Sequence, residues 1–334
     1  MPKKNKLIRL SLCIPNYNRA YDLLRVIEDI KAQTVKPYEV IIVDDISDKK
    51  NTAIIKKRLK LEPHMKYSVN KKNQGLAGNA NIAISKSRGD YSVIISNDDR
   101  LSPHFVEEVM RALKKYPNYN VYTTNAIGIT DKHGIVGDYR FYRKDAVIKK
   151  GVGARHMWKY FFISMITVSG ATIYKTSYKK THPFYKPYNN EADLDNALTF
   201  LSTQDVMFID KPIYYVRMHQ DQESTKIRLD KKKLLDNVTR CLHIYAKHKA
   251  LQKTIPNYMA HMKAVYLLQL GGKYRLSIKE INQILKIKSI KEWFIVLRYC
   301  VQYVFVQIVL NVTFAFDRSS YLRYFTMKDL PHKN

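Results

Sequence analysis

Cysteine is scarce in this 334-residue chain, which has three. Cys13, Cys241 and Cys300 lie far apart, and no partner stands at the spacing of a zinc site. This argues against a disulfide scaffold and a zinc-dependent fold, and it predicts free thiols in a reducing compartment. Residues 1–15 are basic, but their apolar run is too short before Pro15 for a signal peptide. We therefore expect a cytoplasmic protein.

Two common phosphate-binding loops are also missing. No G-x-G-x-x-G follows the first apolar strand pattern, and no G-x-x-x-x-G-K-[ST] occurs anywhere. Dinucleotide-binding folds and P-loop enzymes hold phosphate with the backbone amides of these loops. A phosphorylated ligand would therefore have to be held by a metal ion or by side chains.

Acidic residues are few, with 29 Asp and Glu against 58 Lys and Arg, which gives a net charge of +29. Such a charge requires an anionic partner, whether nucleic acid, an acidic membrane surface or phosphorylated substrates. The net charge alone does not distinguish among these three kinds of partner. The hydrophobic content of 46% excludes general disorder, and the length suits one large α/β domain with an appendage, or two domains.

The stretch Tyr91–Arg100 organises the rest of the sequence. A short β-branched run, typical of a buried strand, ends abruptly in S-N-D-D. The adjacent carboxylates of Asp98 and Asp99 repel unless a cation or hydrogen-bond donors lie between them, and open α/β sheets bind ligands at this end of a strand. The pattern favours a site for a divalent metal and a phosphorylated ligand. A turn followed by a helix cap at Ser102-Pro103 is the structural alternative.

Strand and helix patterns alternate through the first hundred residues. The expected strands are Ile8–Ile14, Val40–Val43, Tyr67–Val69 and Tyr91–Ser96; the expected helices are Tyr21–Gln33, Thr52–Leu61 and Leu76–Ser87. A fully apolar second strand is typical of a parallel βαβ unit, whose strands end at one edge of the sheet. We expect that edge to carry Tyr17, Asp45, Lys72 and the Asp98–Asp99 pair, which suit a base, a ribose or base NH, a diphosphate and a metal.

Each of these residues also has a plainer interpretation. Tyr17 could belong to the core, and Asp44 is typical of a cap or turn. Lys71 and Lys72 could be part of a solvated face in so basic a chain.

Five segments resemble the family 2 glycosyltransferases: CIPNYNRA, AQTVKPYEVIIVDDIS, NQGLAGNANIAI, GDYSVIISNDD and SGATIYK. The resemblance spans about Leu7 to Ser224. It implies the GT-A fold, a Rossmann-like α/β architecture with a mixed, mainly parallel sheet flanked by helices. It also implies inverting transfer of a sugar from a nucleotide-diphospho-sugar. We assign residues 1–225 to this domain and 226–334 to a helical, basic and apolar extension.

The resemblance also implies roles for individual residues. It places Pro15 and Tyr17 beside the base, Asp45 on the base NH, Asp98 near ribose and diphosphate, and Asp99 on Mn²⁺ or Mg²⁺. Two positions depart from the family pattern: Asn97 begins the DxD-type motif, and Ala80 stands where many relatives have Arg before the matching Asn81, which we keep among the donor-site residues.

Three alternating carboxylates, Glu191, Asp193 and Asp195, stand near the start of an expected helix at Leu194–Leu201. An inverting transfer needs a carboxylate that takes the proton of the acceptor hydroxyl. The family places an Asp of an ED-like motif there, and Asp193 is the nearest match, with Asp195 and Glu191 as fallbacks. Acidic residues that stabilise the helix dipole are the alternative.

The segment YYVRMHQDQE resembles a family segment whose histidine approaches the metal or diphosphate. His219 and Arg217 are therefore donor-site candidates, and a structural histidine is the alternative. Further on, Trp293–Phe316 is long enough to span a bilayer, but polar residues interrupt it and basic residues flank both ends. An apolar segment lying in an anionic membrane interface is favoured over a buried core helix.

Together these patterns predict a metal-dependent glycosyltransferase at the cytoplasmic face of the inner membrane. It would transfer one sugar to a glycan or lipid-linked acceptor in bacterial-type surface polysaccharide assembly. A processive polysaccharide synthase is disfavoured because no Q-x-x-R-W segment and no set of clear spanning helices is present. A nucleic-acid-binding protein would interleave basic residues with exposed aromatics, whereas the aromatics here lie largely in apolar runs.

Overall fold

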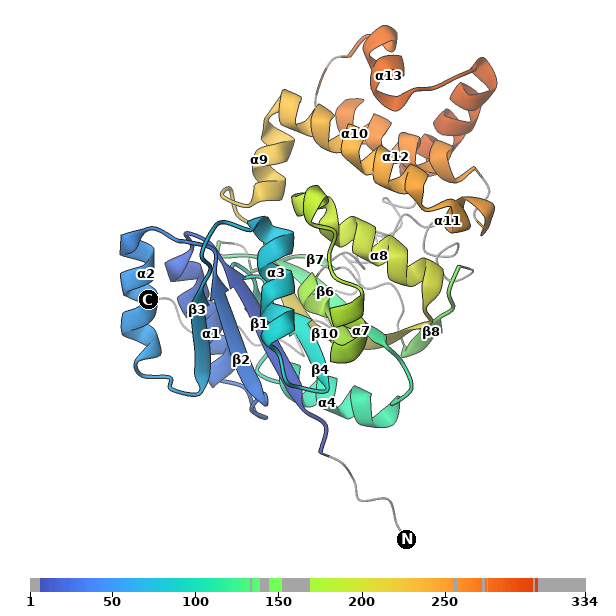
Figure 1. Ribbon diagram of the computed structural model, residues 1–334. Helices are drawn as coiled ribbons and strands as arrows, with labels where there is room; N and C mark the ends of the chain where they lie inside the picture. The colour runs from blue at the N-terminus through green and yellow to red at the C-terminus, as the bar shows by residue number, and fades with distance from the viewer. Residues whose placement is uncertain are drawn as a thin grey trace.

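The computed structural model describes residues 7–132, 134–138, 144–151, 169–254, 257–271, 274, 276–302 and 304–305 (Figure 1). Within these ranges ten strands form one sheet, in the order β3-β2-β1-β4-β9-β6-β10-β5, with β7 beside β6 and β8 beside β10. The strands are β1 (Leu10–Asn16), β2 (Glu39–Asp44), β3 (Met65–Val69), β4 (Tyr91–Ile94), β5 (Arg100–Leu101), β6 (Val121–Thr130), β7 (Gly134–Asp138), β8 (Ala146–Ile148), β9 (Thr172–Lys175) and β10 (Val206–Arg217).

The sheet is mixed and mainly parallel, as predicted. Strands β1 to β4 pair in parallel, and so do β6 and β10. Strand β9 is antiparallel to both β4 and β6, so it joins the two parallel halves. A short 3-10 turn, η1 (Ser169–Ala171), precedes β9.

Helices cover both faces of the first half-sheet, because side chains of a strand point alternately to opposite faces. Leu12 and Ile14 of β1 pack in the core that contains α1 (Ala20–Lys31), α2 (Lys49–Leu59) and α4 (Phe105–Lys115). Cys13 points to the other face, where it meets α3 (Gly75–Lys86). The remaining elements before the extension are α7 (Thr176–Thr181), η2 (Lys186–Glu191) and α8 (Ala192–Thr203).

The C-terminal helices gather above α8, on the side of the molecule where α3 begins (Figure 1). They are α9 (Glu223–Leu229), α10 (Lys231–Lys247), α11 (Lys249–Thr254), α12 (Tyr258–Gly271) and α13 (Ile278–Leu285), followed by a helical stretch over 290–302. One apolar cluster joins Leu198 of α8 and Phe208 of β10 to Val238 of α10. The extension therefore shares a core with the domain that precedes it.

The apolar segment Trp293–Phe316 is described as far as residue 305, and its remainder lies outside the described residues. Val296 and Cys300 are buried against Ala260 and Ala264 of α12. No described helix is long and apolar enough to cross a membrane.

Candidate functional site

A cavity of about 190 Å³ opens at the carboxyl edge of the parallel strands. It brings together Pro15 near the end of β1, Asp98 after β4 and Asp193 at the start of α8, residues expected to face the donor and the acceptor. Its full lining is Pro15, Arg19, Leu76, Ala77, Ala80, Ile94, Ser96, Asn97, Asp98, Phe184, Ala192, Asp193 and Glu223. We refer to it as the acidic cavity.

Asp98 lies between an imidazole and a guanidinium group. Its Oδ2 atom is 3.3 Å from Nε2 of His219 and 3.6 Å from Nη1 of Arg19. All three side chains are partly accessible, with 14% of His219 and 18% of Asp98 exposed. A carboxylate oxygen beside an imidazole nitrogen is a combination that Mn²⁺ accepts and that Mg²⁺ uses less often. Diphosphate oxygens could complete such a coordination shell.

Asp99 has a different environment, which argues against its expected role as the metal ligand. Its Oδ2 accepts a hydrogen bond from the Tyr214 hydroxyl at 2.6 Å, and its Oδ1 accepts one from the backbone N–H of Arg217 at 2.9 Å. Burial, followed by the charge of Asp98, raises the pKa of the Asp99 carboxyl to about 7. Because both oxygens already bind protein donors inside the core, Asp99 anchors the loop after β4 to β10, and Asp98 is the better placed ligand.

The carboxylates after β2 hold the neighbouring loops in place. Asp44 accepts hydrogen bonds from the backbone and hydroxyl of Ser47, both at 2.7 Å, as the turn-forming alternative predicted. Asp45 accepts 2.8 Å hydrogen bonds from Asn70 and from the backbone N–H of Gln74. A base that bonded to Asp45 would therefore share this carboxylate with the loop that begins α3.

Two of the expected base and phosphate contacts lie at the surface. Tyr17 is 52% exposed, which excludes the core alternative and leaves its ring free to stack on a ligand. Lys72 is exposed as well, and its carbonyl accepts a hydrogen bond from Gln74.

Asn81 and Arg217, both expected at the donor, make structural contacts within the protein. Asn81 exchanges two 2.8 Å hydrogen bonds with the backbone of Phe184, so it fixes a wall of the acidic cavity without facing it. Arg217 is buried and clamps Asp131 through Nε and Nη2 and Asp22 through Nη1. His219, two residues further on, turns to Asp98 instead.

The three alternating carboxylates at the start of α8 take separate roles. Glu191 is buried and accepts hydrogen bonds from Asn237 at 3.0 Å and Arg240 at 2.8 Å, both on α10. Asp195 lies 3.0 Å from Nε2 of His248. Asp193 lines the acidic cavity. The geometry therefore favours Asp193 over the two fallbacks as a group that could reach an acceptor.

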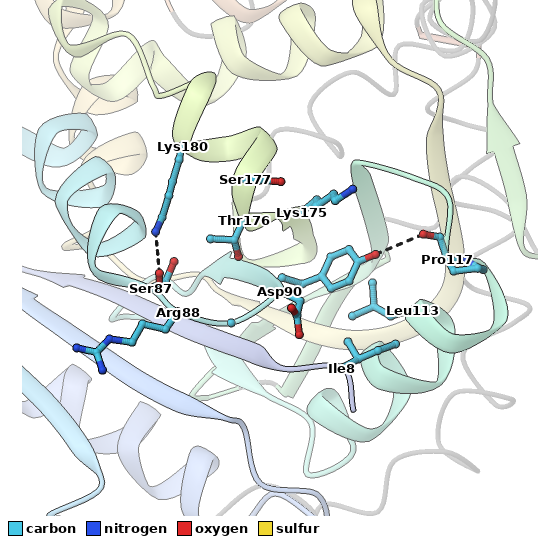
Figure 2. A pocket seen from close by; sticks show the side chains of 12 residues that line it. Ile8, Ser87, Arg88, Asp90, Leu113, Pro117, Lys175, Thr176, Ser177 and Lys180 are labelled. Atoms are coloured by element: carbon cyan, nitrogen blue, oxygen red, sulfur yellow. Dashed lines mark hydrogen bonds between the residues drawn. The ribbon is translucent and has the colours of Figure 1, made fainter. Parts of the chain in front are cut away.

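A larger cavity of about 530 Å³ lies at the opposite edge of the sheet (Figure 2). Asp90 and Tyr91 at the start of β4 line it together with Lys175 and Lys180, and the Lys180 amine points to the carbonyl of Ser87. The larger of the two cavities is therefore not the one that contains the expected site residues. The smaller cavity is the better candidate because it lies where the parallel strands end and is lined by Asp98 and Asp193, two carboxylates expected at the site.

Sequence reasoning missed Arg19. It lines the acidic cavity, approaches Asp98 and donates to the carbonyl of Asp221 at 2.7 Å. Its position in C-I-P-N-Y-N-R-A, three residues beyond the end of β1, was the available signal. Within the described ranges no group of three or more His, Cys, Asp or Glu side chains gathers into a metal site, so a bound ion would depend on its ligand for part of its coordination.

Residues 11–176, about half of the chain, match the sequence model of glycosyl transferase family 2. The GalNAc(5)-diNAcBac-PP-undecaprenol beta-1,3-glucosyltransferase of Campylobacter jejuni is 24% identical over 297 residues, which cover 84% of this chain and 89% of that protein. An uncharacterized glycosyltransferase of Haemophilus influenzae is 33% identical over 115 residues, 33% of this chain. That match spans 36% of the Haemophilus protein, so the chain covers about a third of its length.

Among solved structures, the crystal structure of S. aureus TarS 1-349 superposes with a TM-score of 0.57 at 16% identity. The superposition covers 89% of this chain and 81% of that one. At this identity the likeness concerns the fold, and a coverage of 89% includes part of the C-terminal region.

Proposed function

Because the chain belongs to glycosyltransferase family 2 and is a glycosyltransferase with relatives in glycan biosynthesis, we propose that it transfers a single sugar with inversion. The donor is a nucleotide-diphosphate-sugar, and the acceptor is a glycan or a lipid-linked saccharide in surface polysaccharide assembly. One observation carries the proposal: Asp98, beside His219 and Arg19, shares a single cavity with Asp193.

On the donor side, Asp98 and His219 would hold Mn²⁺ or Mg²⁺, which supplies positive charge to the departing diphosphate. Arg19 contributes a further positive charge at the same carboxylate. The GT-A-like neighbour TarS has been crystallised with UDP-GlcNAc, which supports a nucleotide-sugar as the class of donor. Pro15 lines this end of the cavity, and the exposed ring of Tyr17 follows it in the chain, so the base is proposed to bind beside them.

On the acceptor side, Asp193 takes the proton of the attacking hydroxyl. The new bond joins that oxygen to the anomeric carbon, while the bond from the anomeric carbon to the diphosphate oxygen breaks and its electron pair leaves with the nucleotide. Glu191 and Asp195 cannot easily share this task because each is engaged with the C-terminal helices or the loop after α10.

The test separates binding from chemistry. Transfer and donor hydrolysis are first screened over a panel of nucleotide-sugars with Mn²⁺ or Mg²⁺. Asp193→Asn is then expected to lower transfer roughly a hundredfold or more, a typical general-base contribution, with donor affinity nearly unchanged. Asp195→Asn and Glu191→Gln are the matched controls. Normal transfer by Asp193→Asn would place the base elsewhere.

We further propose that the protein works at the cytoplasmic face of the inner membrane as a peripheral protein. Ile290, Phe294, Leu297 and Val301 are exposed and recur at helical spacing, so they form one apolar stripe. Lys288, Lys291 and Arg298 are exposed nearby, and they would attract an anionic lipid surface. The undecaprenol-linked acceptor named for the Campylobacter relative supports a membrane location for the acceptor.

A further inference from the structure

Lys179, on α7, is a lysine in an unusual place. It is 1% exposed, and its Nζ atom donates a hydrogen bond to Oδ1 of Asn196 on α8 at 2.5 Å. The same nitrogen lies 3.5 Å from the ring centroid of Phe184 and 4.9 Å from that of Tyr174. The amine is therefore enclosed by two aromatic rings and one amide.

A buried ammonium group needs a nearby negative charge, or it gives up its proton. Burial lowers the pKa of Lys179 to about 7, and the carboxylates of Asp193 and Asp195 act in the opposite direction. Asp195 is already paired with His248. Asp193 precedes Asn196 by three positions on α8, so the two side chains lie on the same face of the helix. Of the two carboxylates, Asp193 has the larger effect on the pKa of Lys179, and it lies one helical turn from the Asn196 that binds the amine.

The amine lies behind a wall of the acidic cavity. Phe184, Ala192 and Asp193 form that wall, and Phe184 separates the cavity from the Lys179 amine that packs on its ring. Because Lys179 is fully buried, it has no path to a substrate atom. Any influence on the reaction is therefore indirect and acts through the residues of this wall, of which Asp193 is the charged one.

We propose that Lys179 is a positioning residue for the transfer, whose buried ammonium group, held against α8 by Asn196, keeps the Asp193 carboxylate ionised to receive the acceptor proton. This inference rests on the proposed role of Asp193 as the base. It gives a reason for a basic side chain in an apolar wall, where a hydrophobic residue would pack at lower cost.

The charges around Lys179 and Asp193 determine in which direction the pH profile of transfer should move when Lys179 is replaced. Away from the cavity, Asp195 is paired with His248. Among the described residues that line the acidic cavity, the other charged side chains are Asp98, Glu223 and Arg19. On the remaining sides Tyr174 of β9 contributes its ring, and α3 contributes alanines to the core around Phe184. Replacing Lys179 by a neutral residue removes an opposite charge close to Asp193, and the loss of an opposite charge favours the protonated form of an acid.

The experiment compares Lys179→Met with Lys180→Met through the pH dependence of transfer. For Lys179→Met we expect the acidic limb of the kcat profile to move up by about one pH unit or more, since an opposite charge shifts a neighbouring acid by roughly 1–3 units. At neutral pH kcat falls, while KM for the donor stays within about twofold. Lys180 is the matched control, because it is exposed on the same helix and its amine binds the Ser87 carbonyl.

Folding is checked by thermal unfolding, and replacing a buried charge by an apolar side chain is often neutral or stabilising. Lys179→Gln, which removes the charge but keeps an amide donor for Asn196, gives a second variant with the same expected shift. A folded Lys179→Met or Lys179→Gln enzyme with an unmoved acidic limb would overturn the inference.

The double variant distinguishes this inference from the proposed function. If Lys179 acts through Asp193, adding Lys179→Met to Asp193→Asn lowers transfer no further than Asp193→Asn alone. Loss of transfer in Asp193→Asn together with a normal profile in Lys179→Met removes only the role of Lys179. Normal transfer in Asp193→Asn removes the proposed base and the inference with it.

Discussion

Asp98 and His219 lie 3.3 Å apart, although 121 residues separate them in the chain. Asp99, next to Asp98, faces the other way and is held by Tyr214 and the backbone of Arg217. Two adjacent carboxylates thus occupy opposite environments, one at a cavity and one in the core. The end of β10 creates both environments, because Tyr214 and Arg217 are part of it and His219 follows it.

Metal-dependent donor binding is expected to depend on Asp98 more than on Asp99. Asp98→Asn removes a charged oxygen ligand, so the part of nucleoside-diphosphate affinity that requires Mn²⁺ is lost. Asp99→Asn keeps an oxygen acceptor inside the core and retains that dependence. Calorimetry of nucleoside diphosphates with and without Mn²⁺ measures both variants. Loss of the Mn²⁺ dependence in Asp99→Asn but not in Asp98→Asn would instead identify Asp99 as the metal ligand.

Arg217→Met is expected to affect stability while leaving donor binding unchanged. The substitution removes hydrogen bonds to Asp22 and Asp131; a charged hydrogen bond contributes about 1.5–3 kcal/mol to the free energy of unfolding, and solvent screening lowers this for Asp131, whose side chain is 59% exposed. Urea unfolding measures the loss, and calorimetry of the nucleoside diphosphate checks the binding. A large fall in donor affinity with intact stability would show that Arg217 contacts the diphosphate.

The stability difference between wild type and Arg217→Met should also depend on pH. The hydrogen bond from Arg217 lowers the pKa of the Asp131 carboxyl. An acid whose pKa is lower in the folded state stabilises the fold at pH values above its pKa in the unfolded chain. That stability is lost as the pH falls through its pKa in the folded state. The difference is therefore expected to be constant near neutrality and to shrink below about pH 4.

Asn81→Ala should weaken the wall of the acidic cavity. It leaves the N–H and carbonyl of Phe184 without their reciprocal partners, at a cost of about 1–3 kcal/mol for each buried group. Because Phe184 lines the acceptor side, KM for the acceptor is expected to rise while metal-dependent nucleotide binding persists. Steady-state kinetics with each substrate varied in turn distinguishes the two effects. A selective loss of nucleotide affinity would contradict this assignment.

Membrane binding is expected to depend on the exposed stripe. Phe294→Glu with Val301→Glu should abolish co-sedimentation with anionic liposomes and leave donor hydrolysis intact, since apolar burial and basic contacts act together. Ile278→Glu on α13, which is 71% exposed and outside the stripe, is the control. These substitutions are sharper than a truncation after Ile290, which would also remove Val296 and Cys300 from their packing on α12. Equal liposome binding by all variants would rule out the membrane role.

The order of elements followed from the sequence because its signals are local. Period-two and period-3.6 patterns located β1 to β4 and α1 to α3, and parallel pairing places their polar ends at one edge. That reasoning placed Asp98 at the edge, whereas Pro15 and Asp193 were expected there only from the family resemblance; the three residues line one cavity. The sequence pattern could not tell which side of the helical stretch over 290–302 is buried. Val296 and Phe294 are both apolar, and they differ only in whether α12 covers them.

What the tertiary structure alone decided is which oxygen or nitrogen atom each polar side chain meets. Asp98 and Asp99 carry the same group, and Arg217 and His219 stand two residues apart, yet each takes a different partner. Successive side chains leave a strand end in different directions, and the partners arrive from elements more than a hundred residues away. For the same reason an isolated reading of α7 gives no sign that Lys179 is buried: its partner Asn196 and the Phe184 ring reach it only when α8 packs against the sheet.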